Sequence, residues 1–440
     1  MKRTVIIGGG ISGLSASWTL CQAPDSGEVL LLEQRDRLGG SIYTEHDHGF
    51  MIEHGPDGFL ANKPEAVELC KSLGLSLQRP NDSQHGVYLR RGHKMYLLPG
   101  GLLPQRQWPY IRSPLLSSLG KLRLFLELVV PPKQDASDES VAHFFIRRFG
   151  REAFTNLIKP LLGGFAGDDV EHLSMQAILP HLRHLESNYG SLILGAHRIG
   201  ADKHQAEFRT LPNGLSSLID ALYESSKDRI RLGYTVTHIK RSDTHWNVHI
   251  DGQSPISASH IIFAVPAWVA AKIIHSVNAE LAALLFEIPY RSGTMIHLAY
   301  HKKDVKQSLR GHGHLIASEE AISACTWSTN KYTGRSSAET QLFRLYLRGT
   351  DLPDRDVIMK ARSELEKALN ITSTPMLTRI YHHQDALPQY QLGHQEHIEK
   401  IQNMIESMDG LYLTGNYLVG VGIPDCIRLS TLVANRVLER

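Results

Sequence analysis

The stretch Thr4-Val5-Ile6-Ile7-Gly8-Gly9-Gly10-Ile11-Ser12-Gly13 decides the fold, because it joins an apolar strand to a Gly-x-Gly-x-x-Gly turn and the start of a helix. Gly8 permits a tight turn, Gly10 lets the backbone approach a pyrophosphate, and Gly13 lets the helix pack close to the strand. The N–H groups and the dipole of that helix face the phosphates. We therefore predict a dinucleotide site formed by Gly8, Gly9, Gly10, Ile11, Ser12 and Gly13.

An acidic residue follows at the distance that such a site requires. A second apolar run, Val29 to Leu32, ends at Glu33, which stands twenty residues after Gly13. A carboxylate at this place accepts hydrogen bonds from ribose hydroxyls. Lys2-Arg3 before apolar residues would also fit a secretory signal, but three consecutive glycines interrupt the apolar stretch. We expect the N-terminus to stay in the folded protein.

The residues after Glu33 indicate which dinucleotide is bound. Gln34 is followed closely by Arg37-Leu38-Gly39-Gly40-Ser41, a second glycine pair with a cation that an NAD enzyme does not need. This pattern resembles the extended FAD signature of the amine oxidase and protoporphyrinogen oxidase group of flavoproteins. The resemblance implies FAD, with Gln34, Arg37, Gly40 and Ser41 along it. Arg37 is available to a phosphate or to a helix C-terminus.

Composition excludes several other classes. The 440 residues include 47 Lys plus Arg and 45 Asp plus Glu, a balance that gives no case for nucleic-acid binding. Even Leu122 to Val130 contains two charged residues, so we find no apolar stretch of the ~18 residues that span a bilayer. The four cysteines form no Cys-x-x-Cys pair, and the 24 histidines lack metal-site spacing, so we expect no metal. We expect a cytoplasmic protein and leave peripheral membrane contact open.

A short strand over Phe50 to Glu53 leads into the turn Gly55-Pro56-Asp57-Gly58. Pro64 to Leu73 is typical of a short amphipathic helix that begins at proline and stops at Gly74, with Lys63 at its entrance.

The middle of the chain, from about residue 100 to 200, has helical periodicity. Leu115, Leu119, Leu122, Leu126 and Val129 recur at helical spacing, with cations and aromatic residues nearby. That mixture suits a helix on a membrane surface. An ordinary helix whose apolar stripe faces the core is the slightly favoured interpretation.

Strands return after residue 205. We expect strands over Ile230 to Thr237, Trp246 to Ile250 and Ile261 to Val265, with Val236 at the adenine. Further strands and one helix, Val357 to Leu369, would form a substrate lobe.

Five segments together carry a more specific resemblance. Arg147-Arg148-Phe149-Gly150, Pro160 to Asp168, Leu173-Ser174-Met175 and Glu186 to Leu192 are similar to the central helices of the protoporphyrinogen and coproporphyrinogen III oxidase family. Leu411 to Ile427, with its Gly-Val-Gly-Ile-Pro-Asp-Cys-Ile ending, resembles the segment that closes over the flavin in that family. Its Gly-rich turn before a helix would also offer N–H groups to a flavin on physical grounds. The resemblance assigns Asn416, Val421, Gly422, Ile423 and the Gly55 to Gly58 turn to the flavin, and Gly163, Gly164 and Phe165 to the substrate macrocycle.

The resemblance also implies an α/β fold, with a Rossmann-like FAD-binding domain of the amine oxidase/glutathione reductase type. We expect that domain in residues 1–85, 205–275 and 400–440. A mixed α+β substrate domain would comprise 86–100 and 276–399, and 101–204 would be a helical insertion.

The implied activity is six-electron oxidation of a porphyrinogen in heme biosynthesis, with oxygen as acceptor and peroxide as product. No catalytic side chain is assigned, because the cofactor carries the chemistry and the protein supplies position and a dry cavity. The anionic propionates of the substrate need cations at the rim of the pocket, and Lys63 is the candidate for that role. The equally weighted alternative is that Lys63 is a solvated residue at the start of a helix.

Three questions remain open at the level of sequence. An amine oxidase or carotenoid desaturase would share Gly8 to Ser41, and a non-redox escort protein could reuse the scaffold. Protoporphyrinogen IX is preferred over coproporphyrinogen III, although Arg90, Arg91, Arg198 and Arg344 cannot be assigned to the pocket from sequence. A homodimer is a further possibility.

Overall fold

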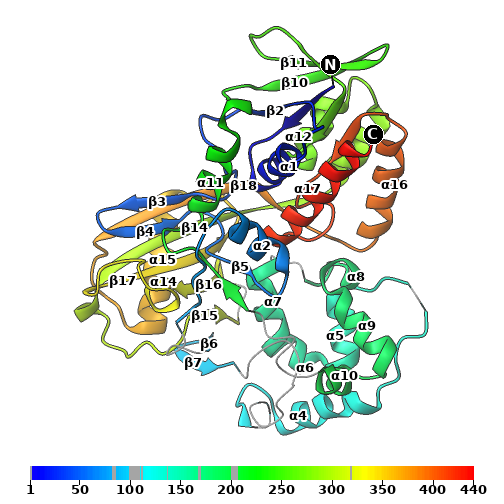
Figure 1. Cartoon of the computed structure of the whole chain (residues 1–440). Helices are drawn as coiled ribbons and strands as arrows, with labels where there is room; N and C mark the ends of the chain where they lie inside the picture. Colours follow the sequence, from blue (N-terminus) through cyan, green and yellow to red (C-terminus); the bar gives the residue numbers. More distant parts are fainter. Residues whose placement is uncertain are drawn as a thin grey trace.

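A five-stranded parallel sheet forms the centre of one half of the molecule (Figure 1). The computed structural model describes residues 2–81, 86–98, 110, 112–135, 137–166, 170–199, 207–317 and 320–440. The strand order is β19-β13-β1-β2-β9, and all four pairings are parallel. The strands are β1 (Arg3–Ile7), β2 (Glu28–Glu33), β9 (Ile230–Leu232), β13 (His260–Phe263) and β19 (Leu411–Leu413). Segments far apart in sequence thus meet side by side.

Helices cover both faces of this sheet, and the alternation along β1 explains why. Ile6 points into a core shared with α1 (Ile11–Gln22), α11 (Ser216–Ser226) and α17 (Ile423–Leu438). Val5 and Ile7 point into the opposite core, which contains α12 (Ala267–Ile274), α13 (Ala279–Glu287) and α16 (His394–Glu406). Successive strand residues face opposite sides, so a sheet buried on both faces is continuously apolar. The predicted α/β class is confirmed.

A seven-stranded sheet dominates the other half, in the order β18-β14-β17-β16-β15-β6-β7. Its strands are β6 (Val87–Arg91), β7 (Lys94–Leu97), β14 (Tyr290–His301), β15 (Gly313–Ile316), β16 (Ile322–Trp327), β17 (Thr340–Arg348) and β18 (Leu377–Pro388). The helix α15 (Asp354–Leu369) packs on one face. The hairpin β3 (Thr44–Asp47) and β4 (Phe50–Glu53) packs on the other through Phe50 and Ile52. This second face is therefore turned toward the parallel-sheet half.

The remaining elements are short or form the helical lobe at the lower right of Figure 1. The lobe comprises α4 (Ser118–Phe125), η1 (Leu126–Val129), α5 (Val141–Phe149), α6 (Arg151–Ala153), η2 (Phe154–Ile158), α7 (Lys159–Ala166), α8 (Met175–Ile178), α9 (Pro180–Tyr189) and α10 (Leu192–Ile199). Elsewhere lie β5 (Phe59–Leu60), α2 (Pro64–Ser72), β8 (Phe208–Arg209), η4 (Lys227–Arg229), β10 (Val236–Ser242), β11 (His245–Ile250), β12 (Ile256–Ala258), η5 (Lys302–Asp304) and α14 (Ser328–Lys331). Within the described ranges, every helix is too short or too polar to cross a bilayer.

Two sequence-based expectations about elements are wrong. The strand expected over Ile230 to Thr237 is two strands, β9 and β10, in different sheets. They separate at Gly233, whose φ of +75° breaks the extended backbone.

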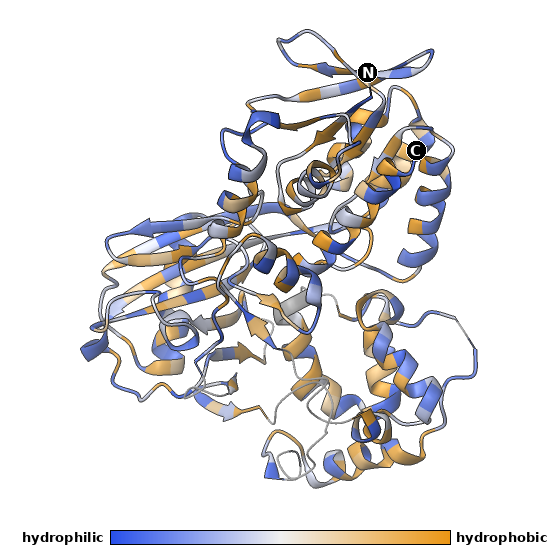
Figure 2. Ribbon diagram, in the orientation of Figure 1, coloured by the Kyte–Doolittle hydropathy of each residue, from blue (hydrophilic) through white to orange (hydrophobic). Residues whose placement is uncertain are grey.

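The second correction concerns the helix expected from Leu115 to Val129. Only α4 is α-helical there. Leu115 is buried in the core of the lobe, but Leu119 and Val129 are 78% and 76% exposed, so the stripe after Leu115 does not face the core. Figure 2 shows orange residues along this segment at the lower edge of the molecule.

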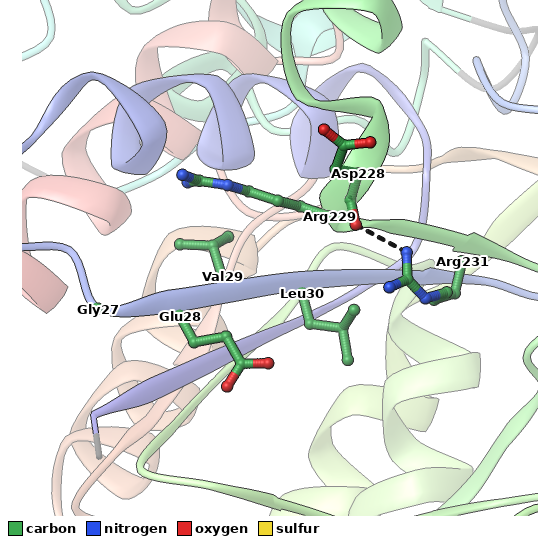
Figure 3. A pocket seen from close by; sticks show the side chains of 7 residues that line it. All are labelled: Gly27, Glu28, Val29, Leu30, Asp228, Arg229 and Arg231. Atoms are coloured by element: carbon green, nitrogen blue, oxygen red, sulfur yellow. Dashed lines mark hydrogen bonds between the residues drawn. The ribbon is translucent and has the colours of Figure 1, made fainter.

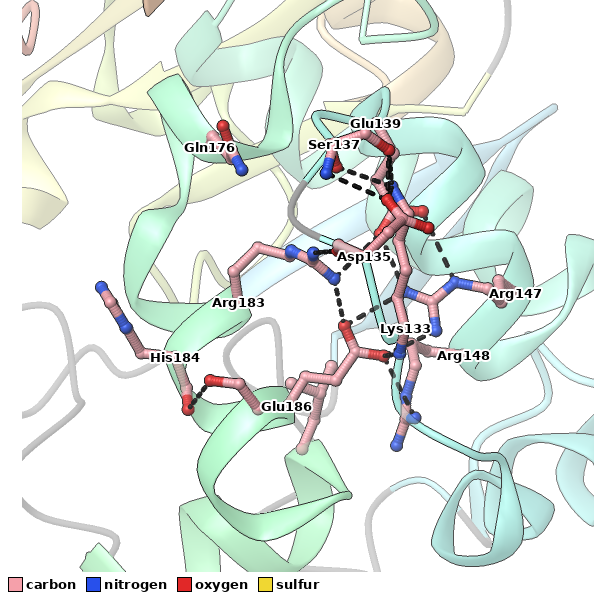
Figure 4. Close-up of polar contacts among 12 residues, drawn as sticks. Lys133, Asp135, Ser137, Glu139, Arg147, Arg148, Gln176, Arg183, His184 and Glu186 are labelled. Atoms are coloured by element: carbon pink, nitrogen blue, oxygen red, sulfur yellow. Dashed lines mark hydrogen bonds and ion pairs between the residues drawn. The ribbon is translucent and has the colours of Figure 1, made fainter.

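A buried ion-pair network joins the helices of the lobe (Figure 4). Arg148 and Glu127 are both fully buried and hydrogen-bonded to each other. Arg148 Nη1 also lies 3.3 Å from Glu186 Oε1, and Glu186 accepts a 2.6 Å hydrogen bond from Arg147. Burying these charges costs desolvation free energy. The ion pairs offset that cost only while every member of the network is present.

Substituting Arg148→Met should leave Glu127 as an uncompensated buried charge. We expect the free energy of unfolding of the lobe to fall by about 3–5 kcal/mol, as for other broken buried pairs. Thermal unfolding and limited proteolysis would measure this loss, with Arg151→Met, an exposed arginine of the same region, as the control. Equal stability of both variants would contradict the assignment.

Candidate functional site

The turn between β1 and α1 brings strand and helix too close for any side chain. Gly8 has a φ of +109°, and its N–H donates to the Leu32 carbonyl over 2.8 Å. A Cβ atom on Gly13 would lie 1.9 Å from the Gly8 carbonyl oxygen. Both positions therefore require glycine, as the motif predicts.

Gly10, in contrast, faces open space. A Cβ atom there would meet no heavy atom within 4 Å among the described residues, although Gly10 is the N-cap of α1. Gly39 N–H donates to the Gly9 carbonyl over 2.8 Å, so the second glycine pair lies directly against the first turn. The first N–H groups of α1 therefore face the space beside Gly10, an arrangement that fits a pyrophosphate.

The Glu33 carboxylate is fixed at the carboxyl end of β2. Its Oε2 accepts a 2.6 Å hydrogen bond from Gly9 N–H, and its Oε1 accepts one of 3.0 Å from Arg35 N–H. Each oxygen keeps a second lone pair, so the group can still accept from ribose hydroxyls. Gln34 beside it is exposed. The backbone of Tyr234 donates to the Glu33 carbonyl over 2.9 Å, which brings the segment before Val236 alongside the acid.

Arg37 shapes the second glycine turn. Its guanidinium donates to the carbonyls of Leu38 and Gly40, each over 3.1 Å, and lies over the Tyr43 ring. Partial burial lowers the pKa of Arg37. Its donors are thus partly occupied by its own loop, an arrangement that the sequence pattern did not predict.

The Gly55 to Gly58 turn lies against this loop. A Cβ atom on Gly55 would be 1.9 Å from the carbonyl oxygen of Ser41, and one on Gly58 would be 2.6 Å from that of Arg209. Between them, the Asp57 carboxylate accepts hydrogen bonds of 2.9 and 3.0 Å from Lys331 Nζ.

Burial alone would raise the pKa of Asp57. The charges of Lys331 and Arg344 outweigh that effect and hold the pKa well below its usual range. Asp57 is therefore an anion that fixes the turn to α14, and Pro56 stiffens the chain beside it.

The C-terminal segment forms a further glycine-rich turn, from Gly415 to Gly422, before α17 begins at Ile423. Asn416 offers its carbonyl to the Tyr390 hydroxyl over 2.5 Å, while Val421 is 38% exposed. The Asp425 carboxylate packs under Gly420 and Gly422. The exposed valine and the start of α17 therefore lie together at this turn.

Lys63 reaches Asp425 across 362 residues of sequence. Its Nζ donates to both carboxylate oxygens, over 2.7 and 2.6 Å. The Lys63 side chain is 43% exposed and that of Asp425 only 9%. The lysine is therefore an ion-pair partner of the C-terminal turn as well as the residue expected to contact the substrate.

The predicted macrocycle residues Gly163, Gly164 and Phe165 lie on α7, which packs against β15 and β16. The side chain of Phe165 falls outside what the structure describes. Of the arginines that sequence could not assign, Arg344 alone is in contact with the Gly55 turn among the described residues. Arg90 pairs with Glu364, and Arg91 donates to Asn156.

Sequence reasoning did not single out Lys331 or Tyr390 for this site, and no motif marks them. Lys331 ends α14 and Tyr390 follows β18, so only the tertiary fold brings them to the site. Asp425 was inside the quoted C-terminal segment, where a carboxylate in the first turn of a helix is an ordinary capping feature.

A surface pocket of about 230 Å³ lies at the opposite end of the parallel sheet (Figure 3). It is lined by Gly27 to Leu30 at the start of β2 and by Asp228, Arg229 and Arg231. Arg231 donates to the Asp228 carbonyl over 2.8 Å. Ligands of such sheets bind at the carboxyl ends of the strands, so this pocket is unrelated to the dinucleotide cradle.

Comparison with known proteins agrees with this geometry. Residues 11–438 match the family described as flavin containing amine oxidoreductase. Coproporphyrinogen III oxidase of Bacillus subtilis is 31% identical and is covered over 96% of its length by 97% of this chain. Chloroplastic protoporphyrinogen oxidase of Oryza sativa is 27% identical, with 96% of this chain and 85% of that protein covered.

Solved structures give the same result. The crystal structure of a candidate protoporphyrinogen oxidase from Exiguobacterium sp. 255-15 superposes with a TM-score of 0.88 at 27% identity, covering 100% of this chain and 99% of that one. The chain belongs to the flavin-containing amine oxidoreductase family. It is an oxidoreductase, FAD is its cofactor, and the predicted resemblance to porphyrinogen oxidases is confirmed.

Gly10→Ala should separate folding from cofactor binding. The new methyl group points into open space, so the free energy of unfolding without FAD should change by no more than about 1 kcal/mol. The same methyl group would meet the pyrophosphate, and we expect the FAD dissociation constant to rise about tenfold or more. Fluorescence titration of the apoprotein would measure it.

Gly13→Ala provides the contrast, because its methyl group would overlap the Gly8 carbonyl and weaken the fold itself. Unchanged FAD affinity of the Gly10 variant would contradict the cradle.

Proposed function

We propose that this protein oxidises a porphyrinogen to a porphyrin in heme biosynthesis. The observation that carries the proposal is the likeness to named porphyrinogen oxidases over nearly the whole chain, together with an open cradle at Gly10 that fits FAD. An amine oxidase is the alternative on the same scaffold, since the putrescine oxidase structure has a TM-score of 0.73, but its 15% identity supports the fold only.

Bound FAD supplies the acceptor for hydride from the bridging CH₂ groups of the substrate. The chain's own contribution is to hold and orient. We assign Gly8 to Gly13 to the pyrophosphate, Glu33 to the ribose and Val236 to the adenine. The Gly55 to Gly58 turn, Asn416 and Val421 to Ile423 are assigned to the flavin, and Gly163 to Phe165 to the macrocycle. We assign no acid–base side chain, because the pyrrole nitrogens stabilise the cation that hydride loss leaves and release its proton.

The first substrate to examine is coproporphyrinogen III. The relative with that name is 31% identical, whereas the protoporphyrinogen oxidase of Oryza sativa is 27% identical. This proposal departs from the preference for protoporphyrinogen IX that the sequence suggested. Coproporphyrinogen III carries two more carboxylates, which would need more cations at the rim of the pocket.

Anaerobic mixing with coproporphyrinogen III should bleach the visible absorption of the bound flavin. Readmitted oxygen should restore it, with formation of porphyrin and peroxide, if oxygen is the acceptor as we propose. Protoporphyrinogen IX serves as the second substrate, and putrescine as the amine control. Bleaching by the amine but by neither porphyrinogen would reject the proposal.

We propose that Lys63 contacts a carboxylate of the substrate while it stays paired with Asp425. Lys63→Ala should raise KM by about five- to tenfold, the effect of losing one charge-assisted hydrogen bond worth ~1–1.4 kcal/mol. The variant also leaves Asp425 unpaired, which would loosen FAD.

The double variant Lys63→Ala/Asp425→Asn separates the two effects, because it removes both charges. FAD affinity should return toward that of the wild type while KM stays high. A KM that recovers together with FAD affinity would limit Lys63 to the ion pair.

We also propose peripheral contact with a membrane through the exposed stripe Leu119, Leu122, Leu126 and Val129, of which Leu122 is 59% and Leu126 46% exposed. Lys121 stands between Leu119 and Leu122 in the sequence and suits anionic headgroups. Anionic vesicles should sediment the wild type but not Leu119→Ser/Leu122→Ser, and equal sedimentation of both would reject the contact. A homodimer and the three-part division of the chain remain predictions.

A further inference from the structure

Two side chains of the seven-stranded sheet converge on the chain that leads into the Gly55 to Gly58 turn. Arg344 of β17 donates from Nη2 to the Gly55 carbonyl over 2.5 Å. His383 of β18 lies with Nε2 2.8 Å from the His54 carbonyl. A carbonyl can only accept, so His383 carries its proton on Nε2. Two successive backbone carbonyls are thus held by two different strands.

Strand register explains why these side chains meet. Arg344 is paired with His297 across β17 and β14, and Gly293 of β14 is paired with His383 of β18. His297 is 1% exposed and lies in edge contact with the Tyr381 ring. This face of the sheet therefore carries polar groups where it meets the turn and apolar ones where it meets β4.

Three neighbouring side chains contact the side chain of His54. Its ring stacks on Tyr381 with the centroids 3.5 Å apart, and Tyr43 packs against its edge at 4.5 Å. Its Nε2 lies 3.0 Å from Glu45 Oε2, which also accepts a 2.7 Å hydrogen bond from the Tyr381 hydroxyl. The residue before Gly55 is thereby immobilised through both its backbone and its side chain.

The other side of the turn is held by charge. Arg344 Nη1 lies 3.6 Å from Asp57 Oδ2, so one guanidinium spans from the Gly55 carbonyl to the Asp57 carboxylate. Arg344 is 3% exposed. The buried, planar guanidinium bridges two points of the turn and so fixes the conformation of the turn. A lysine, with a single point charge, cannot bridge both points.

We propose that Arg344 and His383 are positioning residues, which together form a clamp that sets the flavin-contacting turn from the sheet of the opposite half. The inference rests on the proposed assignment of Gly55 to Gly58 to the flavin. In this proposal the seven-stranded sheet affects both the affinity for FAD and the environment of the bound flavin, in addition to any part it plays in binding substrate.

The test compares Arg344→Lys and Arg344→Met with Arg348→Lys. Arg348 lies on the same strand and donates to the Glu320 carbonyl over 2.9 Å, so it makes the same kind of bond away from the turn. We expect both Arg344 variants to raise the FAD dissociation constant about tenfold, as for loss of a hydrogen bond from a charged group. Their bound flavin should also have a shifted visible spectrum and reduction potential, whereas Arg348→Lys should leave all three unchanged.

His383→Phe and His382→Phe form a second pair, useful if the Arg344 variants do not fold. His382 is the neighbouring residue of β18 and contacts Asp354 instead of the turn. Only His383→Phe should weaken FAD binding and shift the spectrum.

Wild-type flavin spectra and FAD affinities in the Arg344 and His383 variants would overturn the clamp. These measurements need no porphyrinogen. If the wild type does not oxidise a porphyrinogen but the Arg344 and His383 variants bind FAD more weakly, the proposed substrate is rejected and the clamp is supported.

Discussion

The rest of the structure depends on the close approach of backbone to backbone at the end of β1. A side chain at Gly13 would lie 1.9 Å from the Gly8 carbonyl, and one at Gly8 would lie 2.5 Å from that of Ala264. These contacts set α1 directly on the parallel sheet. Its free N–H groups then point into the space beside Gly10, and the second glycine turn and the Glu33 carboxylate close around that space.

Similar close contacts recur in the other turns of the site. Gly55 lies against the Ser41 carbonyl, Gly58 against the Arg209 carbonyl, and Gly420 against the side chain of Asp425. A lysine from a distant part of the sequence then holds an aspartate of each of two turns. Asp57 is held by Lys331, and Asp425 by Lys63. The site is therefore a set of tight turns fixed by long-range ion pairs.

Much of the central sheet could be predicted because its signals are local. β1, the turn at Gly8 and α1 follow one another within twenty residues, and α2, α5 and α15 have clear helical periods. The expectation that the apolar stripe faces the core was met at Leu115 but was wrong from Leu119 to Val129, because periodicity gives the width of an apolar face but not what covers it. The strand expected through Gly233 was also wrong, because an apolar run does not reveal a change of sheet.

The sequence by itself determined the cofactor cradle, since glycines, strand, helix and acid stand at fixed spacings along a short segment. The tertiary structure decided which of many cations serve the site. Arg90, Arg91 and Arg344 are chemically identical in the sequence, yet only the register of β17 against β14 and its packing on the Gly55 turn bring Arg344 there. Contacts between residues hundreds of positions apart depend on how sheets pack, and no local pattern encodes that packing.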